Sequence, residues 1–452
     1  MREALRSFFN PHDPTARAPR RIFWTGFAVR VLYMTLAHTY RIRPAEDHFQ
    51  FGWEAGRIAR ALVSGYGYAD PFSNVWVAHT GPTAWLPPLY PLLLAGIFRI
   101  FGVFTPASGW VLFTIQSAFS AATAFAVWEI GIRCFSRRVA LWSAWIWALY
   151  PAAMQYAVRW PWEMTITTAL FTFVVALAIR MGAIGEQTPP RSDSGLNAWL
   201  KFGVLWALIA LSNPTLLIFL PVCGLWIVAR VPARSAAIRG VALAAVVFLA
   251  CIAPWTARNY AVFHRFIPLR GNFGAELYMG NGPGSTGLLM EYLHPFQDPA
   301  QLRRYAEVGE VRYTAERGAA ARAFIVAHPV HFLADVARRI WFFWAGVPSD
   351  QAWYKEAARI LNFAFISVAG LLGLALALRN RVPAAGLFAL AFLLLPIPYY
   401  IVTVHARFRH PLEPLIAILA VYLFQSAECR PPKSCQAPKT VEIAPSSTIH
   451  AG

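Results

Sequence analysis

The chain has 452 residues, of which 57% are hydrophobic and only 14% are charged. Soluble domains carry roughly 25% charged residues, so this balance argues against a water-soluble protein and indicates one embedded in lipid. The formal net charge is +18. The basic residues are scattered between apolar runs, which argues against nucleic-acid binding.

Arginine, rather than lysine, supplies nearly all of the positive charge. Its guanidinium binds phosphate and carboxylate groups through two parallel hydrogen bonds, which would suit an anionic lipid substrate. A genome rich in G and C would also favour arginine, so composition leaves both explanations open. The 5 cysteines lie outside the long polar loops. No Cys/His cluster has the spacing of a zinc site, so no dedicated metal site is expected.

Apolar runs recur along the whole chain. A membrane-crossing helix needs about 20 apolar residues, and the runs predict an all-α bundle of roughly 10 to 12 such helices. The predicted segments are 22–40, 88–103, 110–131, 140–158, 165–183, 199–212, 214–228, 240–255, 360–378, 384–402 and 412–424. The two segments that flank Asn213-Pro214 are expected to form a hairpin broken at that proline.

Loop charge predicts the orientation, because positively charged loops are retained in the cytoplasm. The basic segment 1–21 and the Pro- and Ser-rich tail 427–452 are expected inside, with residues 22–426 forming one membrane module. The long loops 41–87 and about 257–359 then face outward and are expected to carry amphipathic helices.

This orientation conflicts with the number of apolar segments at one place in the chain. Segments 88–103 and 110–131 lie between an outer loop and a cytoplasmic loop, so only one of them can cross the membrane fully. The sequence does not decide which one is re-entrant. Segment 332–347 contains several charges and is expected to be an interfacial helix rather than a span.

Acidic residues in the outer loops are the first candidates for chemistry. A helix starting before Phe51 would place Asp47 and Glu54 two turns apart, at the border of one apolar stripe. A carboxylate there could act as a general base on an acceptor hydroxyl. Alternatively, Glu54 pairs with Arg57 and Asp47 caps the helix. Glu163, in RWPWEMT, is on the same side and serves either catalysis or a helix N-terminus.

Basic residues at the same outer boundary are the second group of candidates. PWTARNYAVFHRF contains Arg258, and HARFRHPLEP contains His405, Arg407 and Arg409. Such side chains could bind a lipid phosphate and stabilise it as it leaves. The alternative is that they are ordinary interfacial arginines beside lipid headgroups. Arg30 lies within the first apolar run, where a charge costs roughly 2.5–3.5 kcal/mol, so a structural partner is expected for it.

The order and spacing of several segments resemble the bacterial relatives of protein O-mannosyltransferases and aminoarabinose transferases, in the family-39-like branch of the GT-C superfamily. These segments are EDHFQFGWE, SGYGYADPF, TAWLPPLYPLLLAGIFRIFG, PWTARNYAVFHRFIPL, MGNGP and ARFRHPLEPLI. Protein mannosyltransferases have His-Pro-Pro-Leu where this chain has Leu86-Pro87-Pro88-Leu89 preceded by Trp85. The large β-domain of the eukaryotic enzymes is also missing from the sequence, so protein is not singled out as the acceptor.

The resemblance implies a GT-C-like bundle whose active site faces outward and uses a polyprenyl-phosphate sugar with inversion. It implies Asp47 as the general base, with the adjacent Glu46 as a possible substitute. Arg258, Arg407 and Arg409, with His405, would bind the donor phosphate. Glu163 and Glu54 would complete the catalytic group.

The sequence therefore predicts a multi-pass glycosyltransferase of the bacterial cytoplasmic (inner) membrane, with its site facing the periplasm or exterior. The expected partners are the polyprenyl-phosphate donor, membrane lipids and a lipid, glycan or protein acceptor. No organic cofactor is expected, although an acid pair near phosphate could recruit a divalent cation. The alternatives are a transporter or flippase of lipid-linked sugars and a non-catalytic assembly partner.

Overall fold

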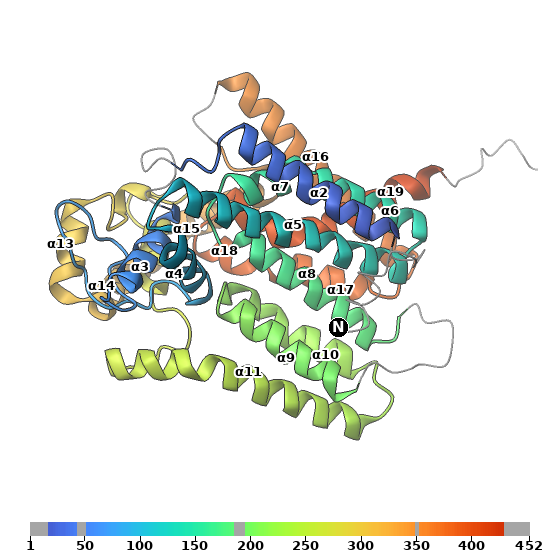
Figure 1. Cartoon of the computed structure of the whole chain (residues 1–452), viewed down its shortest axis with the longest axis horizontal. Helices are drawn as coiled ribbons and strands as arrows, with labels where there is room; N and C mark the ends of the chain where they lie inside the picture. Colours follow the sequence, from blue (N-terminus) through green and yellow to red (C-terminus); the bar gives the residue numbers. More distant parts are fainter. Residues whose placement is uncertain (1–16, 43–50, 185–194, 349–351, 429–452) are drawn as a thin grey trace, which may run out of the picture.

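The computed structural model describes residues 17–42, 51–184, 195–348 and 352–428. Within these ranges the chain is built from helices, and its extended pairing is limited to an isolated bridge between Ala69 and Pro82. Most long helices run side by side in one bundle, and the helices of the two loops predicted to face outward gather at one end of it, which we call the outer end (Figure 1). The predicted all-α membrane architecture is confirmed.

Four helices in the described ranges have the length and composition to cross a membrane. They are α5 (Pro106–Cys134), α8 (Met164–Met181), α11 (Arg234–Phe263) and α16 (Trp353–Arg379). Each of them contains or closely matches a predicted apolar segment. Helix α8 is largely enclosed by its neighbours, whereas α11 lies at the edge and leaves most of its apolar surface for lipid.

The other predicted segments also correspond to helices, but several of them are broken. The bundle includes α2 (Arg17–Leu36), α6 (Arg137–Leu149), α7 (Pro151–Val158), α9 (Leu196–Ala210), η2 (Pro214–Phe219), α10 (Leu220–Val228), α17 (Ala385–Leu394), α18 (Ile397–Ile401) and α19 (Glu413–Glu428). Segment 140–158 divides at Pro151 and segment 384–402 at Pro396, because proline cannot donate the hydrogen bond that would continue the helix.

Helix length indicates which of segments 88–103 and 110–131 can cross the membrane. Helix α4 (Leu89–Phe101) has 13 residues, which gives a length of about 20 Å at 1.5 Å per residue. That is shorter than the hydrocarbon core of about 30 Å, whereas the 29 residues of α5 exceed it. Helix α4 packs against α3 (Glu54–Val63) at the outer end (Figure 1), so α5 is the segment that can cross.

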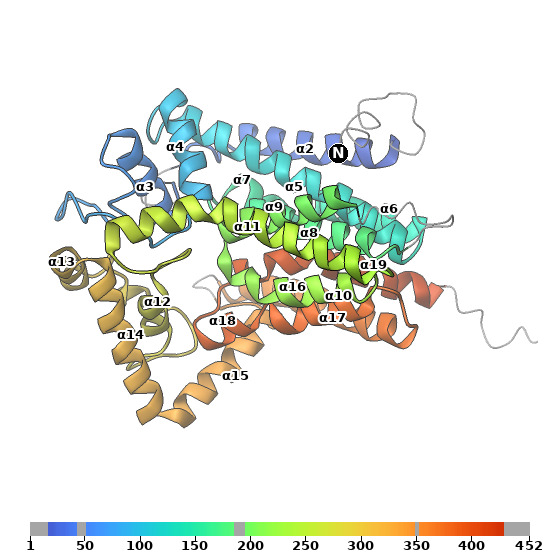
Figure 2. The ribbon, with the colours of Figure 1, turned by 90° about the horizontal axis from the view of Figure 1, so that it is seen from below.

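The outer loops carry their own helices, as predicted. Besides α3, they are α12 (Phe273–Gly280), η3 (Glu291–Leu293), α13 (Pro299–Val308), α14 (Glu310–Ala327), α15 (Pro329–Ala345) and, before the last helix, η4 (Ala406–Leu412). Helices α14 and α15 form a wedge that projects from the outer end (Figure 2). Helix α15 covers most of segment 332–347, so the helix predicted there is present, and its interfacial position stays a prediction.

The predicted helix that joins Asp47 to Glu54 needs correction. Helix α3 begins only at Glu54, since Phe51, Gly52 and Trp53 all have positive φ angles of 61°, 84° and 53° that interrupt helical structure. A Cβ at position 52 would lie 2.3 Å from the backbone oxygen of Pro161, so glycine permits this close approach. Asp47 lies outside the described residues.

Arg30 has the structural partners expected from the sequence. Its side chain is fully buried and donates to the backbone oxygens of Gly26 and Ala148, and to Ser120 Oγ at 3.2 Å. The carbonyls at the end of α6 are available because Pro151 interrupts the helix there. Arg30 thus supplies hydrogen bonds to carbonyl oxygens left free at the end of α6 and links α2 to α6.

Candidate functional site

A cavity of about 420 Å³ lies where the outer helices meet the bundle. This central cavity has the size typical of small-molecule sites. Its walls come from segments far apart in the sequence: 52–55, 86–91, 161–164, 212–215, 270–279, 289–294 and 398–408. The central cavity therefore exists only because the two long outer loops fold together over the ends of the membrane helices.

Charged and titratable side chains occur on several walls of the central cavity. They are Glu54, Glu163, Arg270, Glu276, Glu291, His294, His405 and Arg407. The structure thus brings together four of the residues singled out in the sequence, Glu54, Glu163, His405 and Arg407. It adds Arg270, Glu276, Glu291 and His294, which sequence reasoning missed.

Glu54 and His294 form a buried pair on one wall. The Nε2 atom of His294 lies 3.1 Å from Glu54 Oε1, and the ring of His294 packs edge-on against Trp53 at 4.9 Å. Burial alone would raise the pKa of Glu54, but the hydrogen bond and charge of His294 outweigh it and lower the pKa below its ordinary value. Arg57 instead donates to the backbone oxygen of Trp53, so the expected Glu54–Arg57 pair is replaced by Glu54–His294.

This pair predicts a pH-dependent contribution to stability. Because the folded pKa of Glu54 is lowered, the pair stabilises the fold above the ordinary pKa of 4.5 and loses this effect as the pH falls through the folded value. We expect Glu54→Gln to melt at a lower temperature than the wild type at pH 7, and the difference to shrink below about pH 4.5. Thermal unfolding of both proteins in detergent at pH 3 to 7 measures the difference in melting temperature. A difference that does not change with pH would contradict this prediction.

Arg407 and His405 line the central cavity together with Trp162 and Glu163. The guanidinium carbon of Arg407 lies 4.1 Å from the ring centre of Trp162, and His405 Nδ1 accepts the backbone N–H of Arg407 at 3.3 Å. No carboxylate in the described part of the chain lies within ion-pair distance of Arg407. Its positive charge is therefore available to an anionic ligand in the central cavity.

The second arginine of the cavity has its charge neutralised. Arg270 Nη2 lies 3.0 Å from Glu276 Oε1, and its Nε donates to the backbone oxygen of Trp85 at 2.9 Å. Asn272 donates to the same Glu276 oxygen at 2.9 Å. Arg270 thus ties the first outer loop to α12, and Arg407 is the better placed of the two to meet a phosphate.

Two of the residues predicted to bind phosphate, Arg258 and Arg409, do not line the central cavity. Arg258 donates to the backbone oxygens of Tyr68 and Thr83, both at 2.6 Å, and does not line the central cavity. Arg409 is fully buried and lies 3.3 Å from Glu413 while donating to Ser367. Both guanidinium groups are occupied in holding the fold together.

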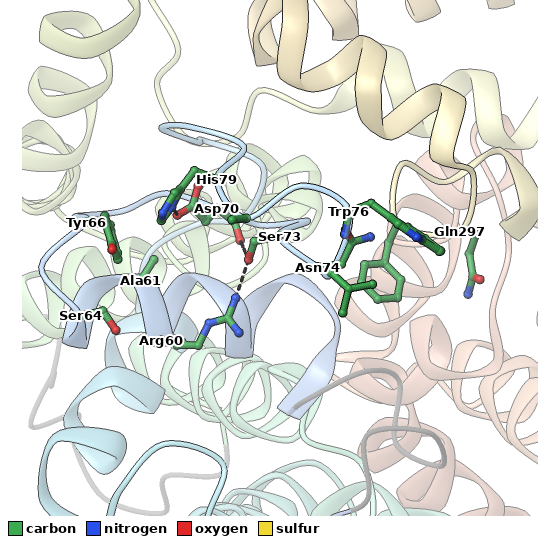
Figure 3. Close-up of a pocket in the computed structure, with 13 residues that line it drawn as sticks. Arg60, Ala61, Ser64, Tyr66, Asp70, Ser73, Asn74, Trp76, His79 and Gln297 are labelled. Carbon is green, nitrogen blue, oxygen red and sulfur yellow. Dashed lines mark hydrogen bonds and ion pairs between the residues drawn. The ribbon is translucent and has the colours of Figure 1, made fainter.

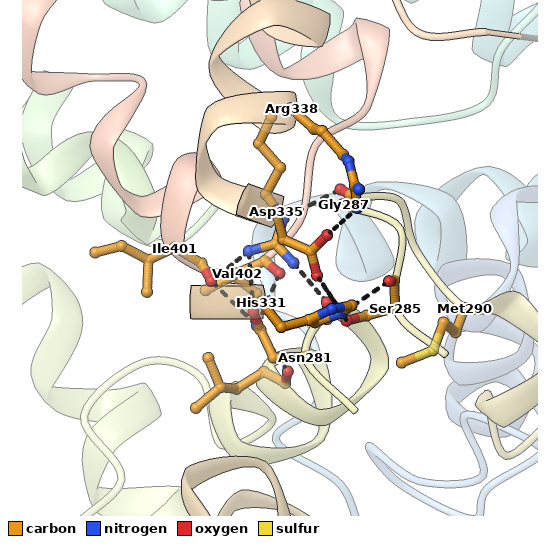
Figure 4. Close-up of polar contacts among 12 residues, drawn as sticks. Asn281, Ser285, Gly287, Met290, His331, Asp335, Arg338, Ile401 and Val402 are labelled. Carbon is orange, nitrogen blue, oxygen red and sulfur yellow. Dashed lines mark hydrogen bonds and ion pairs between the residues drawn. The ribbon is translucent and has the colours of Figure 1, made fainter. Parts of the chain in front are cut away.

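The wall between Leu289 and Thr403 is fixed by a polar network on α15 (Figure 4). Arg339 donates to Asn281 Oδ1 at 3.0 Å, to the backbone oxygen of Gly287 at 3.0 Å and to that of Ile401 at 2.9 Å. On the same helix, Asp335 binds Ser285 at 2.6 Å and Arg338 at 2.9 Å. Helix α15 therefore holds segment 281–287 against the chain before η4, which positions two sides of the cavity.

Comparison with known proteins agrees with this architecture. Residues 86–257 match the family model described as dolichyl-phosphate-mannose-protein mannosyltransferase. No curated protein matches the chain. The apo oligosaccharyltransferase of Archaeoglobus fulgidus is similar in structure, with a TM-score of 0.50 and 14% identity over 89% of this chain and 50% of the archaeal chain.

Two further structures are similar over most of the chain. The same archaeal protein with Zn and sulfate has a TM-score of 0.50 at 14% identity, covering 89% of this chain and 49% of its own. ArnT from Cupriavidus metallidurans, bound to undecaprenyl phosphate, has a TM-score of 0.39 at 14% identity, covering 89% and 79%. The chain spans about half the length of the archaeal proteins it matches. The predicted resemblance to GT-C glycosyltransferases is confirmed, and the shared feature is a multi-pass membrane fold.

Proposed function

We propose that this protein is a glycosyltransferase that takes a sugar from a polyprenyl-phosphate carrier at the outer face of the bacterial cytoplasmic membrane. The observation that carries the proposal is the central cavity, which is lined by the carboxylate Glu163 and by Arg407, a guanidinium without an ion-pair partner among the described residues. The proposed donor class is supported by the family model that matches residues 86–257, whose description names a dolichyl-phosphate sugar. Lipid, glycan and protein all remain candidate acceptors.

In the proposed reaction, Arg407 binds the phosphate of the donor. An acceptor hydroxyl gives its proton to Asp47, its oxygen attacks the anomeric carbon, and the bond from that carbon to the phosphate oxygen breaks. The electron pair leaves with the polyprenyl phosphate, whose growing negative charge Arg407 stabilises. Attack from the face opposite to the phosphate inverts the anomeric carbon, through a transition state with oxocarbenium character.

The remaining cavity residues have supporting roles in this proposal. Glu163, at the start of α8, positions the acceptor or the sugar, and the Glu54–His294 pair shapes the wall from which the first outer loop leads back to Asp47. We assign Arg258 and Arg409 structural roles, because backbone oxygens and Glu413 already occupy them. A divalent cation is not required by this scheme.

The test is a turnover assay with purified protein in liposomes that contain a polyprenyl-phosphate carrying a radiolabelled sugar, to which lipid, glycan and protein acceptors are each added in turn. We expect the wild-type protein to convert the donor to free polyprenyl phosphate and labelled acceptor, and protein-free liposomes to leave it intact. A flippase would move the donor to the other leaflet without consuming it. Translocation without release of polyprenyl phosphate would therefore contradict the proposed transferase.

A further inference from the structure

A second cavity, of about 700 Å³, opens on the outer end of the molecule. We call it the outer cavity. Its wall includes Arg60, Ser64, Tyr66, Trp76 and Gln297 (Figure 3).

The outer cavity adjoins the central cavity through two shared segments. The start of α3, at Glu54 and Ala55, lines the central cavity, and the same helix from Arg60 to Ser64 lines the outer one. Likewise, His294 faces the central cavity and Gln297, three residues later, the outer cavity. A long ligand held in the outer cavity would thus lie next to the wall of the reaction site.

Two exposed aromatic rings line the outer cavity. Trp76 is 65% exposed and Tyr66 is 59% exposed. Trp76 is nevertheless held, because Asn74 Oδ1 accepts its backbone N–H at 2.9 Å and that of Val77 at 3.0 Å. The ring of Tyr66 lies 4.4 Å from that of His79. Both rings therefore line the outer cavity with part of their surface open to a ligand.

The position of these rings argues against lipid as their ligand. The loop between α3 and α4 lies at the outer end with α13 and α14 (Figures 1 and 2), where it contacts the polar last turns of α11 at Arg258. The rings are also surrounded by groups that form hydrogen bonds, Ser64, Asn74 and Gln297. A ligand here must offer both flat apolar faces and hydroxyl groups.

The charges of the outer cavity argue against a polyanion. Asp70 is satisfied within the protein, since its carboxylate accepts from the backbone N–H groups of Thr80 and Gly81 and lies 2.9 Å from His79 Nδ1. Arg60 donates to Ser73 Oγ at 2.6 Å and has no carboxylate within ion-pair distance in the described part of the chain. One free guanidinium beside neutral donors and acceptors suits a sugar, whose hydroxyls both donate and accept.

We propose that the outer cavity binds a saccharide, the part of a glycan acceptor that does not react. The C–H faces of pyranose rings would stack on Trp76 and Tyr66, while their hydroxyls bond to Arg60, Ser64 and Gln297. The acceptor role rests on the proposed function, whereas saccharide binding does not. The acceptor would then pass from the outer cavity to the central cavity along α3.

The test measures binding without any donor, so it does not depend on catalysis. Full-length protein in detergent is applied to an arrayed panel of oligosaccharides from bacterial cell envelopes. We expect at least one saccharide to bind, and Trp76→Ala and Gln297→Ala each to weaken that binding about tenfold or more. Trp353→Ala is the matched control, because Trp353 is 81% exposed but lies at the start of α16, outside both cavities.

The outcomes separate this proposal from the proposed function. Two results together would support a site distinct from the reaction centre: saccharide binding is weakened in Trp76→Ala and is unchanged in Arg407→Ala. This conclusion would hold whether or not sugar transfer is found. Transfer by the wild type with no saccharide bound from the panel would overturn the outer site alone. Binding that is equally strong in Trp76→Ala and Gln297→Ala, or lost equally in Trp353→Ala, would overturn it as well.

Discussion

We expect Asp47→Asn to slow sugar transfer by about 10²- to 10⁴-fold, the range that a positioned general base contributes. Asparagine has nearly the same size and shape as aspartate but cannot take the proton from the acceptor hydroxyl. The initial rate of release of polyprenyl phosphate from a radiolabelled donor measures the effect at matched protein concentration. The substituted protein should keep its wild-type melting temperature, because the change leaves the cavity walls intact.

The control for this prediction is the neighbouring acid. Glu46→Gln should transfer sugar at close to the wild-type rate, and a large loss in that variant alone would move the base to Glu46. Both residues lie outside the described ranges, but Gly52 lines the central cavity. Wild-type transfer by both variants would exclude Glu46 and Asp47 as the base and would leave Glu54 as the carboxylate of the first outer loop on the described cavity wall.

The membrane helices could be predicted because the length and apolar character of a run are local properties. Segments 110–131 and 240–255 are the cores of α5 and α11, and the proline after Asn213 does end α9 and begin η2. The sequence could not show that α4 is too short to cross, since its apolar run continues past Phe101 into the turn at Gly102. There the φ angle of 91° ends the helix.

The candidate site was only partly predictable, because it depends on contacts between distant segments. Glu163 and Arg407 could be chosen since each lies at the outer end of an apolar run. The same signal also selected Arg258 and Arg409, whose partners come from elsewhere in the chain. Charge and position alone cannot distinguish an arginine that faces a cavity from one that binds carbonyl or carboxylate groups inside the protein.

His294 was missed for the opposite reason. It lies in the long outer loop, at the end of η3, with no apolar periodicity or motif around it. Its partner Glu54 is 240 residues away, so their contact appears only once the two outer loops are folded together. Arg270 was missed for the same reason, because its contact with the backbone oxygen of Trp85, 185 residues away, also forms only in the folded loops.

The second large effect that we expect is a loss of kcat when Arg407, the proposed ligand of the leaving phosphate, is replaced. Arg407→Gln should lower kcat about 10²- to 10³-fold, which is typical when a fixed group that stabilises developing charge is removed. Arg407→Lys should recover part of the rate, because it keeps the charge but loses the planar, bidentate geometry. Single-turnover transfer with saturating donor measures the chemical step directly. Arg99→Gln is the control, since Arg99 is an exposed arginine on α4 that does not line the cavity.

The distribution of charge in the central cavity determines how this result is interpreted. A purely structural role for Arg407 would lower the melting temperature along with kcat, whereas the role proposed here lowers kcat at an unchanged melting temperature. Unchanged kcat in Arg407→Gln would leave Arg270 as the remaining arginine on the described walls. Arg270 already pairs with Glu276 at 3.0 Å, and it could bind phosphate only by sharing or giving up that carboxylate. In that case Glu276→Gln should change the rate of sugar transfer, whereas phosphate binding by Arg407 predicts no such change.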